Sequence, residues 1–74
     1  MTPTITTGDF YCFSKSDDIW IVTAISDRIH MTRIFDHFET SLFPQFVTDY
    51  GRYLGNVSTT PISQLKDFYP ELFI

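Results

Sequence analysis

Apolar residues run almost unbroken from Ile19 to Ile25, and most of them are β-branched. Successive side chains of an extended strand point to opposite faces, so this segment would place apolar groups on both. A strand of that kind is covered on both sides or is curled inside a small barrel. A seven-residue helix is the weaker interpretation, because β-branched side chains favour strands. The segment is predicted to be the central strand around which the chain folds.

Two further strands are predicted beside the central one. Residues Asp9–Ser14 alternate between two faces, and a third extended segment runs from Arg28 to about Asp36. The polar segments that separate these strands, residues 14–18 and 26–28, have the length of hairpin connections. Three strands joined by two short connections predict an antiparallel meander.

The segment from Phe35 to Leu54 has two interpretations. Its aromatic residues recur every three or four positions, which is typical of a helical stripe. Pro44 would lie inside that helix and would cost about 3 kcal/mol or more. Either a long loop leads into a strand, or a short helix begins near Phe43–Pro44 with the proline in its first turn. We favour a mostly irregular segment that contains at most a short helix.

One more strand and a terminal helix are predicted after this segment. Residues Arg52–Ser58 form the strand, with a bulge at Gly55. Thr60 is the predicted N-cap residue of the helix, and Pro61 is its first helical residue. Pro70 ends the helix, because the residue before a proline avoids the α region. The apolar residues 72–74 are expected to pack against the body of the protein.

The predicted fold is therefore mainly β with a short C-terminal helix. Residues 1–7 are expected to form a flexible N-terminal tail, and residues 8–74 a single small β-rich domain. A first strand led by Gly8, a central strand that contains Trp20 and a Gly-Asn-Val-Ser strand that leads into a terminal helix resemble the SH3-like small antiparallel β-barrels. The resemblance covers about residues 8–68 and concerns architecture.

The resemblance implies a small barrel or meander and carries no site residues with it. Peptide-binding SH3 domains have an acidic loop followed by Trp-Trp or Trp-Tyr, and this pattern does not occur in the sequence. We therefore assign no polyproline-binding residues.

The composition adds a surplus of aromatic side chains to this picture. Eight Phe, four Tyr and one Trp occur in 74 residues, and each such side chain can bury about 150–250 Å². The core of so small a domain cannot enclose all of them, so several are expected at the surface, which is a first indication of a partner. The single cysteine, Cys12, permits no intrachain disulfide and fits a reducing compartment.

The charge narrows the classes of partner. The net charge is −4, whereas binding to a phosphate backbone requires clustered Lys and Arg. Nucleic acid is therefore a disfavoured partner. No basic-then-apolar signal opens the sequence and no apolar run approaches 18 residues, so we expect a cytoplasmic protein that does not enter a membrane.

Catalytic chemistry has few candidates. Cys12 could pair with His30 or His37 as a thiolate and an imidazole, but a thiol among aromatic residues is usually a small buried hydrophobe. Asp17 and Asp18 are adjacent in a predicted turn, where Asp commonly bonds its own backbone. We expect a protein that is not an enzyme.

Metal binding also has a weak basis. His30 and His37, with Asp36 and Glu39 nearby in the sequence, could be ligands. A site needs three or four converging ligands with supporting hydrogen bonds, and two histidines on a strand edge and a loop are more often solvated. We expect no metal and no cofactor.

The strongest functional signal is the mixture of aromatic and acidic residues between Phe35 and Tyr53. These rings could simply cap the open end of a barrel. They could also form a patch, rimmed by carboxylates, that binds a protein with a basic surface. On the second interpretation the partner-binding residues are Asp36, Phe38, Glu39, Phe43, Phe46, Asp49 and Tyr50.

Two other functions remain open beside this protein-interaction module. The chain could be a small acidic inhibitor, of viral or mobile-element type, that occludes a basic groove of a nucleic-acid-handling protein. It could also be a self-associating structural subunit that pairs through an exposed strand edge or through residues 72–74. Salt dependence of binding separates the first alternative from aromatic anchoring, and sedimentation tests the second.

Overall fold

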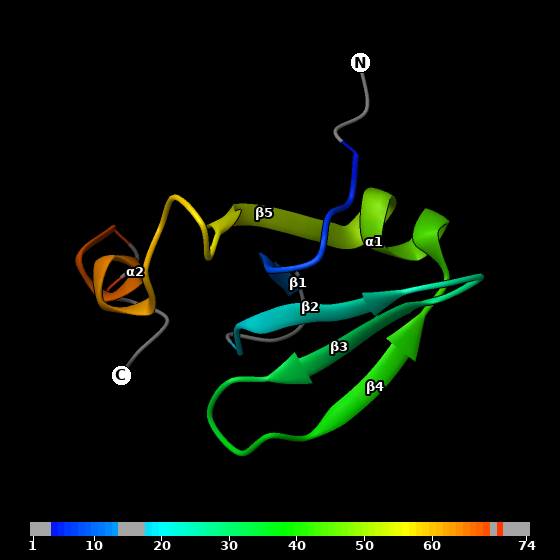
Figure 1. Cartoon of the computed structure of the whole chain (residues 1–74), viewed down its shortest axis with the longest axis horizontal. Helices are drawn as coiled ribbons and strands as arrows, with labels where there is room; N and C mark the ends of the chain where they lie inside the picture. Colours follow the sequence, from blue (N-terminus) through cyan, green and yellow to red (C-terminus); the bar gives the residue numbers. More distant parts are fainter. Residues whose placement is uncertain (1–3, 14–17, 69, 71–74) are drawn as a thin grey trace.

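The computed structural model describes residues 4–13, 18–68 and 70. Five strands form one antiparallel sheet in the order β4-β3-β2-β1-β5, accompanied by two short helices (Figure 1). The elements are β1 (Asp9–Phe13), β2 (Trp20–Ile25), β3 (Ile29–Arg33), β4 (Glu39–Leu42), α1 (Pro44–Tyr50), β5 (Gly51–Asn56) and α2 (Ile62–Phe68). The mainly β prediction is confirmed. Within the described residues β4 and β5 are separate edges, so the sheet is open and is not a closed barrel.

The centre of the core lies at β1. Four successive residues of this strand, 9–12, are buried, because β2 pairs with one of its edges and β5 with the other. β2 is the middle strand, as predicted, but only its first half is covered on both faces. It pairs with β1 only at Trp20 and Ile21, and its last three residues, from Thr23 to Ile25, are exposed. The predicted covering of the whole Ile19–Ile25 segment is wrong for this second half.

The core consists of two clusters of buried side chains, and each helix contributes one residue. Leu65 anchors α2 in the first cluster, and Val47 anchors α1 in the second. Consecutive residues of β1 alternate between the clusters, so the clusters lie on opposite faces of the sheet. The first cluster contains Phe10, Cys12, Ile19, Leu54 and Leu65. The second contains Tyr11, Val22, Ile29, Met31 and Val47.

The segment after β3 is more regular than predicted. The third strand ends at Arg33, because the chain turns at His37, which has a φ of 61°. β4 then pairs with β3, and α1 begins at Pro44 after an extended Phe43. A proline at the first helical position lacks only an N–H that would have no intrahelical partner. The expectation of a mostly irregular segment is wrong, and the alternative of a short helix beginning at this proline is confirmed.

The bulge predicted in β5 is confirmed. Phe10 pairs with Gly55 and Tyr11 with Tyr53, so the register shifts by one residue at Leu54. Gly55 has a φ of 142°, a backbone angle that residues other than glycine rarely adopt. The shift directs Leu54 into the first cluster.

The helix α2 begins one residue later than predicted. The carbonyl of Pro61 accepts hydrogen bonds from the N–H groups of Gln64 and Leu65, which places the proline just before the first helical residue. The expected packing of residues 72–74 lies outside the described residues.

Hydrogen bonds at Thr6 and Gly8 fix the segment that precedes β1. The Thr6 N–H donates to the Asp9 carboxylate at 2.8 Å, and the Gly8 N–H donates to the Val22 carbonyl at 2.7 Å. Residues 1–3 lie outside the described residues, and the flexible tail over residues 1–7 stays a prediction.

Candidate protein-interaction surface

Aromatic rings follow one another across the face of the sheet that holds the second cluster. Trp20 and Tyr11 are direct partners in the β1–β2 pair. Trp20 meets Phe38 edge to face, with ring centroids 6.2 Å apart, and Tyr11 meets Tyr53 in the same manner at 5.7 Å. The pairing of strands therefore brings together four rings that are distant in the sequence.

The rings continue from the sheet onto α1. Phe13 lies two residues after Tyr11 and so on the same face of β1. Its ring centroid is 5.9 Å from that of Phe46, which is 4.8 Å from that of Tyr50. Phe46 and Tyr50 are four residues apart and therefore lie on the same side of the helix. We call this set the aromatic row: Tyr11, Phe13, Trp20, Phe38, Phe46, Tyr50 and Tyr53.

The outer members of the aromatic row are open to solvent. The exposed fractions are 56% for Phe38, 44% for Phe46, 57% for Tyr50 and 48% for Tyr53. Tyr11 is buried in the middle of the row, where burial and the nearby Asp9 raise the pKa of its hydroxyl. Phe13 and Trp20 are half-buried. The row thus has a packed base and large exposed rings on which another surface could lie.

A glycine provides the space for the base of the row. An added Cβ at Gly51 would lie 3.1 Å from the Tyr11 ring, 3.3 Å from the Phe13 ring and 2.5 Å from the Val47 carbonyl oxygen. Any larger residue would displace both rings or the end of α1. Gly51 therefore permits the close approach of β5, α1 and β1 that aligns the row.

Arg33 fixes the Phe38 end of the aromatic row. Its guanidinium carbon lies 5.3 Å from the centroid of the Trp20 ring and 5.2 Å from that of Phe38. The same guanidinium donates to both carboxylate oxygens of Asp36, at 2.8 and 2.6 Å, and to Asp18 at 2.9 Å. The hydrogen bond from Arg33 holds the pKa of the Asp36 carboxyl down at about 2.

The pH dependence of this end of the row follows from that lowered pKa. A carboxyl that ionises more easily in the folded state stabilises the fold above its ordinary pKa of 3.8 and loses the contribution as pH falls through about 2. We expect the Asp36 carboxyl, followed by NMR, to titrate near 2 in the wild type and at a clearly higher pH in Arg33→Gln, where the hydrogen bond from the Phe38 N–H still holds its pKa below 3.8. Arg52→Gln removes the same charge from β5 and should leave the titration near 2. Equal midpoints in wild type and Arg33→Gln would contradict the assigned ion pair.

The structure gathers some of the sequence-predicted site residues and separates others. Phe38, Phe46 and Tyr50 belong to the aromatic row. Asp36 lies beside Phe38, where its carboxylate is bound by Arg33 and by the Phe38 N–H. Asp49 lies next to Tyr50 on α1 and accepts a hydrogen bond from Gln45 at 2.9 Å.

Two of the predicted residues lie away from the row. Glu39 pairs with Thr32, and this pair faces the side of the sheet opposite to the row, because Ile21, the β2 partner of Thr32, packs on the first cluster. The Phe43 ring lies under the guanidinium of Arg28, 4.5 Å from its carbon.

Sequence reasoning missed four of the seven rings of the row and the arginine beside them. Tyr11, Phe13, Trp20 and Tyr53 all lie outside the predicted set, as does Arg33. The alternation along β1 already placed Tyr11 and Phe13 on one face, but the register that sets Trp20 beside Tyr11 comes from long-range pairing.

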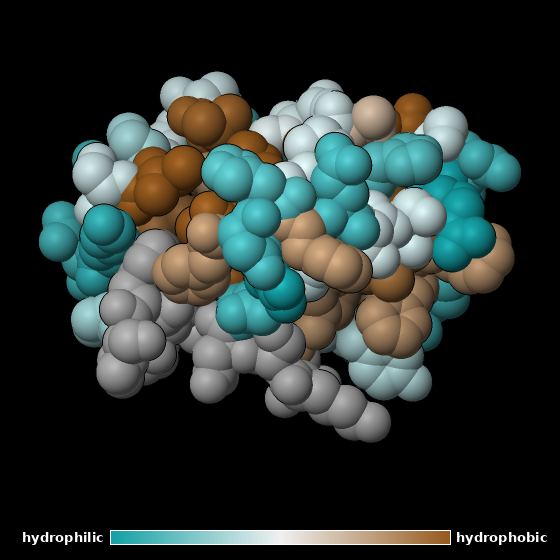
Figure 2. Space-filling view, turned by 90° about the horizontal axis from the view of Figure 1, so that it is seen from below, coloured by the Kyte–Doolittle hydropathy of each residue, from teal (hydrophilic) through white to brown (hydrophobic). Residues whose placement is uncertain are grey.

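A second exposed apolar surface lies at α2. Ile62 and Phe68 are both exposed on this helix. Figure 2 shows strongly hydrophobic surface gathered toward the left, the end at which α2 lies, and polar residues between it and the apolar groups farther right. The aromatic row therefore competes with one other region as a docking surface.

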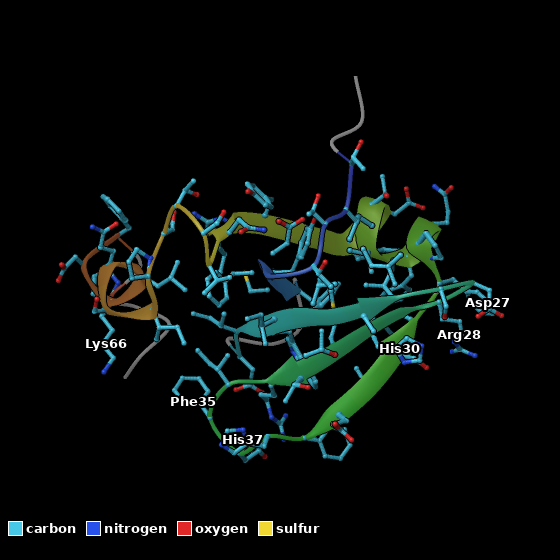
Figure 3. The ribbon with its side chains drawn as sticks, viewed as in Figure 1. Asp27, Arg28, His30, Phe35, His37 and Lys66 are labelled. Atoms are coloured by element: carbon cyan, nitrogen blue, oxygen red, sulfur yellow. The ribbon has the colours of Figure 1, made fainter. Side chains whose placement is uncertain are left out.

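The two histidines lie at opposite ends of β3 (Figure 3). His30 is near the β2–β3 hairpin, where its ring is 3.3 Å from the Ser26 hydroxyl, and His37 is in the turn before β4. Cys12 is buried in the first cluster, whereas both histidines are exposed. Among residues 4–13, 18–68 and 70, no three His, Cys, Asp or Glu side chains converge as metal ligands would.

Within the part of the chain that the structure describes, neither helix has the length and apolar character needed to cross a membrane. Comparisons with protein-family models, with curated proteins and with solved structures found no match.

Proposed function

We propose that this protein is a non-catalytic interaction module that binds a partner protein through the aromatic row. The observation that supports the proposal is the gathering of three groups of contacting rings on one face of the sheet, with large exposed fractions at Phe38 and Tyr50. Buried centres of protein interfaces are enriched in Tyr, Trp, Phe and Arg. Arg33, already held over two of these rings, pays little conformational entropy on binding.

The partner that suits this surface has a basic face. Asp18, Asp36 and Asp49 lie beside the row, and the chain carries a net charge of −4. Acidic residues around an apolar centre would accelerate encounter with a cationic surface and orient it. The proposal includes a cytoplasmic location, which the single cysteine supports.

We also propose that the architecture is related to the SH3-like small barrels. The pairing of the first strand with the last, and the register shifts in β2 and β5, support this relation. Both features curve a sheet toward closure. An experimental structure with a flat, untwisted sheet would argue against it.

The functional proposal is tested by deleting single rings. The partner is first captured from the native cell with the immobilised chain and identified by mass spectrometry. We expect Phe46→Ala to weaken its binding at least about tenfold, because Phe46 joins Phe13 to Tyr50 in the row. Phe68→Ala is the matched control: it deletes an exposed ring from α2 and should change the affinity less than about twofold.

Equal effects of the two variants would contradict the assignment of the row. The salt dependence of the same binding reaction tests the contribution of charge. A steep loss of affinity between low and moderate salt would favour the acidic inhibitor, whereas salt-insensitive binding would favour aromatic anchors.

A further inference from the structure

The strand β4 lies at the edge of the sheet, with β3 on one side and no drawn element on the other (Figure 1). The Arg33 N–H donates to the Phe38 carbonyl at 2.8 Å. This bond identifies which opposite residues of β3 and β4 are hydrogen-bonded pairs. Hydrogen-bonded pairs alternate along an antiparallel pair of strands, so Thr40 and Leu42 direct their backbone groups toward β3. The backbone N–H and C=O groups of Glu39 and Ser41 therefore point away from the sheet.

Arg28 lies at this same edge. Its guanidinium donates to the outward carbonyl of Ser41 at 3.2 Å and stacks on the Phe43 ring. Its buried Nε has no hydrogen-bond partner, and no carboxylate pairs with Arg28 among the described residues. Figure 3 shows Arg28 near the tip of the β2–β3 hairpin, beside the end of β4. The edge thus carries a positive charge next to Ser41.

Glu39 supplies the complementary charge two residues away. It is exposed, and no cation pairs with it within the described part of the chain. Glu39 and Ser41 occupy the same side of β4 because they are two residues apart. Among the described residues, the carboxylate of Glu39 therefore lies at one end of the outward-facing segment and the guanidinium of Arg28 at the other, beside Ser41.

We propose that a second copy of this chain adds to the sheet by antiparallel pairing of β4 with β4. A two-fold axis through Thr40 sets Glu39 of each copy opposite Ser41 of the other. Their outward backbone groups then pair, since each carbonyl can accept two hydrogen bonds. Because Arg28 lies at Ser41, it meets Glu39 of the second copy, and symmetry repeats this ion pair.

A second copy fits this edge better than an arbitrary extended peptide, because it supplies the charges that complement Arg28 and Glu39. The chain's own Arg28 and Glu39 are complementary only when the two strands run in opposite directions about Thr40. The pairing also joins two identical hollows. A hollow of about 460 Å³, lined by residues that include His30, Thr32 and Ser41, reaches β4 on the same side as Glu39. In the dimer it would continue across the two-fold axis.

This association is expected to be weak because β4 is short. Four residues of β4 bury less surface than a stable interface needs, so we expect a dissociation constant on the order of 100 μM to 1 mM. This self-association uses a different surface from the aromatic row, and either can fail without the other.

Sedimentation equilibrium and NMR amide exchange on the full chain test the proposal between about 10 μM and about 3 mM, a range that brackets the expected constant. We expect the mean mass to rise from 8.7 kDa toward twice that value. The amides of Glu39 and Ser41 should gain protection at the higher concentration, whereas the amide of Thr40 should be protected at both. A mass of 8.7 kDa throughout, or unchanged exchange at Glu39 and Ser41, would overturn the proposal.

Variants then identify the interface. Ser41→Pro removes an outward N–H and leaves the hydrogen bonds to β3 in place, so it should abolish the rise in mass while the circular dichroism stays native.

Glu39→Arg should weaken association at least about tenfold through repulsion from Arg28, and the double variant Arg28→Glu/Glu39→Arg should restore part of the loss. Asp67→Arg makes the same charge change on α2 and should leave association unchanged. Undiminished dimerisation of both Ser41→Pro and Glu39→Arg would exclude the β4 edge.

Discussion

Phe10→Ala is expected to lower the free energy of unfolding by about 3–5 kcal/mol and to shift the midpoint of urea unfolding to a much lower concentration. Phe10 is completely buried in β1 and packs in the cluster that joins the sheet to α2. Its removal deletes a large apolar contact and leaves a cavity that neighbouring strands can only partly fill. A domain of this size has a total stability of only about 5–10 kcal/mol, so the loss is a large part of the whole. Urea unfolding followed by circular dichroism measures it.

The control for this prediction makes the identical change at a solvent-exposed ring. Phe68→Ala removes a side chain that is 66% exposed and should change the free energy of unfolding by less than about 1 kcal/mol. Similar losses in the two variants would contradict the assignment of Phe10 to the core.

Leu65→Ala is expected to cost about 2–5 kcal/mol and to release α2 from the sheet. Leu65 is the buried residue of this helix among its described positions. The helix is only seven residues long, and helices of that length have little stability without tertiary packing. We therefore expect faster amide exchange throughout α2 in this variant, while the amides of β2 and β3 keep their protection.

A matched variant on the same helix separates packing from helix propensity. Ile62→Ala shortens an exposed apolar side chain of α2 and should cost less than about 1 kcal/mol. Because Leu65 and the aromatic row lie on opposite faces of the sheet, folded Leu65→Ala should retain partner binding. Exchange in α2 as slow as in the wild type would show that other contacts hold the helix.

Substitutions beneath the aromatic row are expected to affect partner binding indirectly. Val47 of α1 packs beneath the row in the second cluster, and Gly51 leaves room for the Tyr11 and Phe13 rings. Neither residue would touch a partner directly. Substitutions at these positions are therefore expected to alter binding by moving the rings, and a measurement of affinity should be accompanied by one of stability.

Local patterns in the sequence determined much of the secondary structure. Runs of apolar residues define β1 and β2, the proline at position 44 begins α1, and Gly55 permits the bulge in β5. These features depend on neighbours in the chain, because backbone angles and side-chain period are local properties. The surplus of aromatic rings was likewise evident from composition, and several of them are exposed.

Only the tertiary structure decided which of these residues meet. The β1–β2 register brings Trp20 beside Tyr11, and the β3–β4 register places Glu39 on the face of the sheet opposite to the row. A shift of one residue would exchange every side chain of a strand between the two faces, and no short-range pattern specifies such a shift in a strand as polar as β4. The sequence by itself therefore determined four of the five strands, all but β4, and the number of aromatic rings. Long-range strand pairing decided the aromatic row, its Arg33 clamp and the free β4 edge.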